Sequence, residues 1–167
     1  MAIRPILRVP APELRRVCAP VERPSAELSA LVTDLIDTLE SIPGCVGIAA
    51  SQVGDRNRVI VVDASRHRKP VENQGRMVLI NPELRSSSGR QVGREGCLSL
   101  PDYTANVPRA QLVEYAALDE ALSPRTVVAR DFEAVVLQHE TDHLDGILFV
   151  DRVVCLKTDL FRRKNYL

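Results

Sequence analysis

The sequence predicts an α+β fold, in which short and mostly antiparallel strands pack around a helix near the C-terminus, with a second, amphipathic helix near the N-terminus. Apolar residues recur at helical spacing after Ser25 and again between Asp131 and Leu144, and short β-branched runs lie between these segments. One helix, several strands and a final helix do not repeat as strand–helix–strand units, so a regular parallel sheet is not expected.

The composition is that of one globular domain, and we expect a single domain over residues 1–167. Hydrophobic residues make up 45% and charged residues 26% of the chain, which argues against intrinsic disorder. Its 22 Lys and Arg balance its 22 Asp and Glu, so no bulk positive charge attracts DNA or an anionic membrane. The sequence shows neither a membrane-spanning run nor a secretory signal. We therefore expect a cytoplasmic protein with reduced cysteines.

The first helix is expected to begin after Ser25, a favourable N-cap residue, and to end near Pro43-Gly44. Its apolar stripe faces the core and consists of Leu28, Leu31, Val32, Leu35 and Leu39. The preceding segment, Ile3–Val21, is rich in proline and is expected to be extended or turning.

Strands are expected at Val59–Val62 and Met77–Ile80, which are short, apolar and bounded by turn-forming residues. The run Ser86–Gly89 is expected to be a turn or loop. Further strands are indicated around Val107, Leu112, Val113, Tyr115 and Val127-Val128.

The second helix is expected over residues 131–144, with Asp131 as N-cap and Gly146 just beyond its end. It contains His139-Glu140-Thr141-Asp142-His143, the pattern H-E-x-x-H. Histidines at i and i+4 share one face of a helix and together reach one metal ion, and the adjacent Glu140 reaches a water on that ion. This helix is thus a predicted metal-binding element.

A catalytic site of this kind needs a third protein ligand. After Glu140 the chain contains no glutamate, and after His143 no histidine. Downstream Asp145, Asp151, Asp159 and Cys155 remain as alternatives. Upstream, Cys97 in Glu95–Ser99 follows a glycine that allows a tight turn, and a metal would bind its thiolate.

Three other features have less specific interpretations. Cys18 and Cys155 are expected to be small buried residues, and His67 to lie in a solvated loop. The segment Cys45–Gln52 is rich in small residues and ends in an amide side chain; it is either a packed buried strand or part of a site.

Together these segments resemble the peptide deformylase family. The family's three motifs occur in order, G-φ-G-φ-A-A-x-Q at Cys45–Gln52, E-G-C-φ-S at Glu95–Ser99 and Q-H-E-φ-D-H at Gln138–His143, where φ is apolar. The second motif is complete, and the third has Thr141 in its apolar slot. The similarity extends over nearly the whole chain. Its clear departure is Cys45 in place of the first glycine, which removes no ligand but changes the rim of the substrate cleft.

The resemblance implies a metal-dependent hydrolase that removes the formyl group from N-formylmethionyl nascent peptides and releases formate. Cys97, His139 and His143 would bind one divalent ion, Fe²⁺ in the native enzyme with Zn²⁺, Ni²⁺ or Co²⁺ as substitutes. Hydroxide on that ion would attack the formyl carbonyl, and Glu140 would act as general base and then as general acid.

The resemblance also implies roles for groups around the metal. The side-chain amide of Gln52 and the backbone N–H of Leu98 would stabilise the developing oxyanion. Glu95 and Arg109 are expected to orient ligands or peptide. The residues expected to bind substrate are Val46, Gly47, Glu95, Phe132, Val135 and Val136.

Family members act on nascent chains, so the basic C-terminal stretch could make a transient contact with the ribosome. Its basic residues are Lys157, Arg162, Arg163 and Lys164. The alternative for this stretch is a solvated helix end.

Two rival functions remain open on the sequence. One is a metallopeptidase or other amidase that uses the same hydroxide. The other is a closed structural zinc site, in which Cys45 replaces water as the fourth ligand.

Overall fold

The computed structural model describes residues 2–163 and has the predicted α+β architecture, with two antiparallel sheets. The larger sheet has the strand order β1-β2-β3-β6-β7, with bounds Gly47–Ala49, Val59–Val62, Met77–Ser88, Leu112–Leu118 and Pro124–Arg130. The smaller sheet has the order β4-β5-β8, with bounds Gln91–Cys97, Leu100–Arg109 and Leu160–Arg162. All strand pairs in both sheets are antiparallel.

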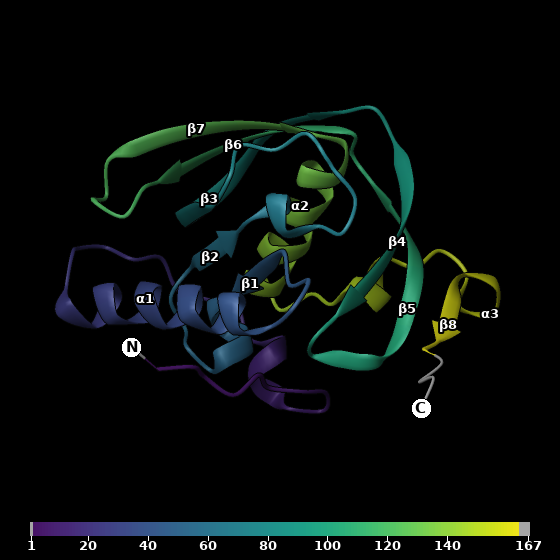
Figure 1. Ribbon diagram of the computed structural model, residues 1–167, viewed down its shortest axis with the longest axis horizontal. Helices are drawn as coiled ribbons and strands as arrows, with labels where there is room; N and C mark the ends of the chain where they lie inside the picture. The colour runs from purple at the N-terminus through teal and green to yellow at the C-terminus, as the bar shows by residue number, and fades with distance from the viewer. Residues whose placement is uncertain (1, 164–167) are drawn as a thin grey trace.

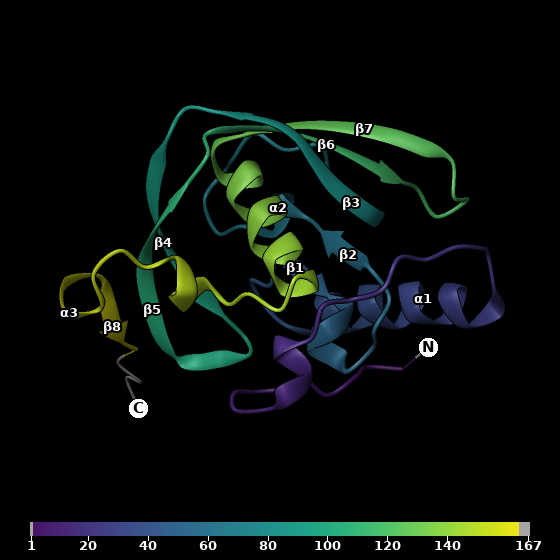
Figure 2. The ribbon, with the colours of Figure 1, turned by 180° about the vertical axis from the view of Figure 1, so that it is seen from behind.

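The α-helices are α1 (Ala26–Ser41), α2 (Asp131–Leu144) and the short α3 (Leu156–Asp159). Figure 1 shows α2 at the centre of the molecule, between the larger sheet and the β4–β5 hairpin, while α1 lies along β1 and β2. The opposite view in Figure 2 shows the N-terminal segment crossing the molecule beside the C-terminal end of α2. Within residues 2–163, no helix has the length and hydrophobicity that crossing a bilayer requires.

Helix α1 begins where the sequence predicts. The Ser25 hydroxyl accepts a hydrogen bond from the Leu28 backbone N–H at 3.1 Å, which satisfies one of the free donors at the helix start. The predicted stripe is buried against β1 and β2, with Leu35 and Leu39 fully enclosed. The helix ends at Ser41, shortly before Gly44, whose positive φ of 72° redirects the chain into β1.

Two faces of helix α2 make different contacts. Ala134, Leu137 and Leu144 pack into a core formed with the larger sheet, and the histidine face turns toward β4. The predicted N-cap is wrong by one residue, since Arg130 is the N-cap and Asp131 is the first helical residue, with a φ of 47°.

The predicted turn or loop at Ser86–Gly89 is wrong for its first three residues. Residues 86–88 continue strand β3, because β6 supplies backbone partners for Ser86, Ser87 and Ser88. This pairing overrides the local preference for a turn. Strand β4 ends with Glu95, Gly96 and Cys97, and the chain turns at Leu98 and Ser99, within the segment where a tight turn was expected, before it enters β5. The irregular pairing between Gly96 and Cys97 marks the point where the strand turns toward α2.

Candidate metal centre and active-site cleft

The side chains of Cys97, His139 and His143 converge although the cysteine and the first histidine lie 42 positions apart in the sequence. One ligand atom from each lies within 4.8 Å of the others. The sulfur of Cys97 is 3.2 Å from Nε2 of His143. Cys97 stands at the end of β4, and both histidines stand one turn apart on α2. A thiolate with two imidazoles suits Zn²⁺ or Fe²⁺, so these residues form a metal-binding site.

The electrostatics of this group favour a bound cation. Burial opposes ionisation of the Cys97 thiol, but attraction to His143 and hydrogen bonds with both histidines hold its pKa well below its usual range. A thiolate is the form that binds a metal. In addition, Glu140 Oε2 is buried and has no hydrogen-bond partner among the described residues, which leaves a site for a polar group beside the ligands.

Glu95 and Arg109 fix the orientation of His139. The Nδ1–H of His139 donates to Glu95 Oε2 at 2.8 Å, which leaves Nε2 facing the other ligands. The Arg109 guanidinium donates to both oxygens of Glu95, at 2.8 and 3.0 Å. Burial raises the pKa of Glu95, but the hydrogen bonds from His139 and Arg109 outweigh it and bring the pKa below its usual range.

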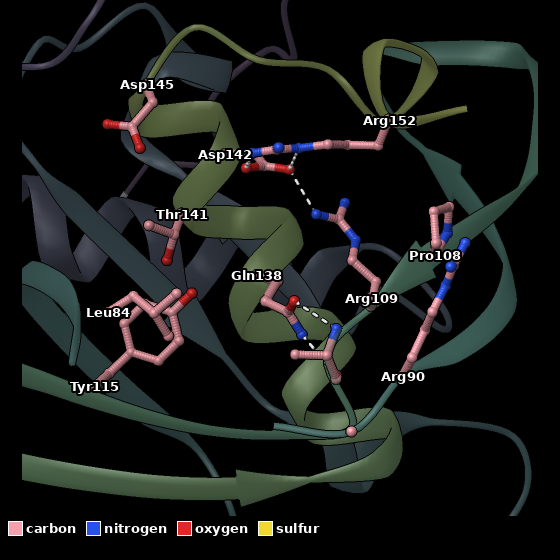
Figure 3. A pocket seen from close by; sticks show the side chains of 12 residues that line it. Leu84, Arg90, Pro108, Arg109, Tyr115, Gln138, Thr141, Asp142, Asp145 and Arg152 are labelled. Carbon is pink, nitrogen blue, oxygen red and sulfur yellow. Dashed lines mark hydrogen bonds and ion pairs between the residues drawn. The ribbon is translucent and has the colours of Figure 1, made fainter. Parts of the chain in front are cut away.

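Arg109 also links this site to the far side of α2. Its guanidinium donates to Asp142 at 2.6 Å, and Arg152 donates to the same carboxylate at 2.7 and 3.1 Å. Figure 3 shows these side chains beside α2, where they line a second pocket of about 480 Å³ together with Thr141. The ion pairs join β5, α2 and the turn Phe149–Arg152, and so hold the metal-binding helix in place.

Glu140 is enclosed by β1. It is 4% exposed, and burial raises the pKa of its carboxyl above the usual value, although attraction to His139 and His143 opposes this shift. A Cβ placed on Gly47 would lie 2.5 Å from Glu140 Oε1. Gly47 was predicted to contact substrate; the structure adds that its missing side chain makes room for Glu140.

Gln52 is held by a short helical turn, Ala50–Val53. Its Oε1 accepts from the Ala49 N–H at 3.0 Å, and its Nε2 donates to Ser99 Oγ at 3.2 Å. The same Nε2 lies 3.5 Å from the Cys97 sulfur. The amide therefore has its donor end toward the metal-binding group, in a fixed orientation.

A cleft of about 450 Å³ leads to these residues. It is lined by every residue predicted to contact substrate or the oxyanion, namely Val46, Gly47, Gln52, Glu95, Leu98, Phe132, Val135 and Val136. The cleft also contains groups that the sequence interpretation missed, including Arg94, Arg163 and His67. His67 lies in a loop as predicted, but its ring is half-buried and lies 4.2 Å from that of Phe132, centroid to centroid, at the cleft wall.

The remaining cysteines do not join the metal-binding group in residues 2–163. Cys45 lines the cleft, but its thiol donates to the Gly47 carbonyl at 3.2 Å, and burial, with the nearby Glu140 carboxylate, raises its pKa to about 11. A protonated thiol is a poor metal ligand, so the geometry gives no support to a closed site. Cys18 is buried as predicted, whereas Cys155 is exposed, because it precedes a short surface helix that packs on no core.

The model of the polypeptide deformylase family matches residues 3–159. The chain belongs to the polypeptide deformylase family. It is thus an enzyme, a peptide deformylase, and its α+β fold matches the fold of that family.

Solved deformylases have the same fold. A peptide deformylase from Legionella pneumophila is 40% identical, with a TM-score of 0.84, over 93% of this chain and 89% of that one. A class I type b peptide deformylase from Acinetobacter baumannii, solved with Met-Ala-Ser bound, is 33% identical with a TM-score of 0.85, over 91% of this chain and all of that one. The Ehrlichia chaffeensis deformylase is 28% identical with a TM-score of 0.84, over 93% of this chain and 90% of that one.

Proposed function

We propose that this deformylase hydrolyses the formyl group from the N-terminal formylmethionine of newly made polypeptides and releases formate, as one catalytic domain over residues 1–167. The observation that carries the proposal is the cleft of about 450 Å³ that ends on Cys97, His139, His143 and Glu140. A carbonyl group bound at the end of this cleft would lie beside both the metal site and a buried carboxylate.

The three ligands would hold one divalent ion, with Fe²⁺ as the native metal and Zn²⁺, Ni²⁺ or Co²⁺ as substitutes. When bound, the ion supplies a Lewis acid that lowers the pKa of water and polarises the formyl oxygen. Cys97 contributes negative charge, and Glu95 holds His139 with Nε2 toward the site.

Glu140 moves the proton. Its carboxylate takes a proton from the attacking water and delivers it to the amine nitrogen as the bond from the formyl carbon to nitrogen breaks. Because Glu140 Oε2 has no partner among the described residues, it is available to accept that proton. The products are formate and a peptide with a free amino terminus.

The Gln52 amide and the Leu98 backbone N–H would stabilise the negative charge that develops on the formyl oxygen. The Gln52 Nε2 donates to Ser99 Oγ at 3.2 Å and lies 3.5 Å from the Cys97 sulfur, so its two hydrogens are aimed toward the metal-binding group. Loss of one such donor typically costs about 3 kcal/mol of transition-state stabilisation.

The apolar cleft wall would receive the methionine side chain. Val46, Phe132, Val135 and Val136 line it, and Gly47 and Glu95 border it. A formyl carbon carries only hydrogen, so a narrow site beside the ligands excludes an acetyl group. The Met-Ala-Ser tripeptide bound to the Acinetobacter baumannii enzyme supports a methionyl peptide as the ligand class.

We further propose action in the cytoplasm on nascent chains, without DNA or a membrane as partner. A transient ribosome contact would use the basic C-terminal stretch. Lys157 and Arg162 are exposed there, while Lys164 lies outside the described residues.

The test combines metal analysis of protein purified without air with an assay of formate release from formyl-Met-Ala-Ser. We expect about one divalent ion per chain and formate release that a chelator abolishes. The same protein is incubated with an internal-peptide substrate. Cleavage of peptide bonds without formate would favour the metallopeptidase alternative and contradict the proposal.

A further inference from the structure

Two arginines line the active-site cleft without a role in the chemistry described above. Arg94 lies on β4, and Arg163 directly follows β8, the last strand. Both are exposed, and within residues 2–163 neither has an ion-pair partner at 4.0 Å or less. They are the exposed charged groups among the residues that line the cleft.

The side chains of β4 alternate between a buried and an exposed face, and Arg94 lies on the exposed face, three residues before the metal-binding Cys97. Glu95 and Cys97 are buried, whereas Arg94 and Gly96 are exposed, so these two share the outer face of the strand. A Cβ on Gly96 would collide with the guanidinium of Arg163, which therefore lies directly over Gly96. The two cationic groups thus follow one another along the same face of β4.

Arg94 is held in position. Its guanidinium carbon lies 3.5 Å from the centroid of the Phe161 ring, and one nitrogen donates to Thr104 Oγ1 at 3.3 Å. Strand β8 pairs Phe161 with Thr104, so the ring is fixed by the sheet. A guanidinium stacked on an aromatic ring keeps its planar donors free for a carboxylate and loses little conformational freedom on binding.

The acidic groups of the cleft do not neutralise these arginines. Glu95 is bonded to Arg109 and His139, and Glu140 is buried against Gly47. The outer cleft therefore has a net positive charge although the whole chain has a formal net charge of +0. Such a local field attracts negative groups on a bound peptide.

We infer that Arg94 and Arg163 form a specificity subsite that selects substrates with an acidic side chain shortly after the formylmethionine. The inference rests on the proposed deformylase function. Arg94 is three residues before Cys97, and an extended strand rises roughly 3.3 Å per residue, so Arg94 lies about 10 Å from Cys97 along β4. An extended peptide with its formyl group at the ligands reaches that distance near its second or third residue.

The experiment compares formyl-Met-Ala-Glu-Ala with formyl-Met-Ala-Gln-Ala and formyl-Met-Ala-Lys-Ala, all as C-terminal amides. The amide removes the terminal carboxylate, so any preference arises from the side chain. At low ionic strength we expect kcat/KM to be about twofold to fivefold higher for the Glu peptide than for the Gln peptide, through a lower KM, because exposed ion pairs have effects of this size. The preference should decrease in high salt. Peptides that carry Glu at position two or four, in place of position three, show which substrate residue lies beside the arginines.

The variants Arg94→Gln, Arg163→Gln and the double variant are measured beside Arg90→Gln. Arg90 is an exposed arginine of the pocket on the far side of α2, so it is a matched control. We expect the double variant to lose the Glu preference, while Arg90→Gln keeps the preference and the wild-type rate on the Gln peptide. Calorimetric binding of the deformylated product peptides gives a readout independent of turnover.

Equal kcat/KM and equal product binding for the Glu and Gln peptides would overturn the inference while leaving the proposed function intact. So would a double variant that retains the preference. If no formyl peptide were hydrolysed, including the Gln peptide, the proposed function itself would fail.

Discussion

Gly47 lies so close to Glu140 that a Cβ on the glycine would be 2.5 Å from the carboxylate oxygen Oε1. The strand β1 and the helix α2 therefore approach one another at the residue proposed to transfer the proton. This contact explains why a glycine is needed in the middle of an otherwise apolar segment, and it makes the position of the carboxylate sensitive to a single methyl group.

The substitution Gly47→Ala is expected to lower kcat at least tenfold with little change in metal content, because Glu140 must move away from its site while all three ligands remain. Overpacking of this kind also costs about 1–3 kcal/mol of stability. Formate assays and metal analysis measure the two effects. Gly93→Ala is the matched control, since a Cβ at Gly93 meets no atom within 4 Å. Wild-type turnover of Gly47→Ala would contradict the proposed position of Glu140.

Glu140→Gln should retain its metal and lose about 10²–10⁴-fold in kcat, because the amide cannot accept the proton from water. The ligands are unchanged, so metal content separates loss of the base from loss of the ion. Turnover near the wild-type rate would show that another group transfers the proton.

Cys97→Ser is expected to weaken metal binding by about a hundredfold or more, since the thiolate is the charged ligand of the group. Competition with a chromogenic chelator measures the affinity. The control is Cys155→Ser, which changes an exposed cysteine outside the metal-binding group. Normal affinity in Cys97→Ser would mean that the third ligand lies elsewhere.

Asp142→Asn should destabilise the fold by about 3–5 kcal/mol, because it removes the carboxylate that accepts hydrogen bonds from the buried Arg109. Arg152→Gln alters the same network at its exposed end, where the arginine side chain is 46% exposed, and should cost no more than about 1 kcal/mol. Urea unfolding of the two variants measures the difference. Equal losses would show that the network in Figure 3 does not depend on the buried arginine.

Alkylation at neutral pH should modify Cys155 before Cys45. Hydrogen bonds to Thr158 lower the pKa of the exposed Cys155 thiol, whereas burial raises that of Cys45 to about 11. A lower pKa gives more thiolate, which is the nucleophile, so Cys155 reacts faster and Cys45 gains reactivity only as the pH approaches 11. Mass spectrometry of iodoacetamide-treated, metal-loaded protein measures the order. Early modification of Cys45 would identify it as a reactive thiol of the cleft.

Both long helices could be predicted because their signals are local. The Ser25 cap, the leucine spacing of α1 and the i, i+4 histidines of α2 all depend on a helical period that neighbouring residues define. The strand limits were predicted less well. Ser86–Ser88 became part of β3 because β6 pairs with it, and that partner lies more than twenty residues further along the chain.

The residues of the candidate site also divide into those that local motifs predict and those that long-range contacts place. Gln52, Cys97 and the α2 residues could be named from motifs, and the structure brings them together around one cleft. Arg94, Arg163 and His67 carry no motif, and their place at the cleft follows from the pairing of β8 with β5 and from the contact of His67 with Phe132. No pattern within the sequence encodes those contacts.

The sequence by itself determined the chemistry, because the kinds of ligand, their helical spacing and the family motifs are properties of neighbouring residues. Only the tertiary structure decided the geometry: how closely Cys97 approaches the histidines, why position 47 carries no side chain, and which charges border the entrance. These depend on long-range strand pairing and close packing, in which residues far apart in the chain share one small volume.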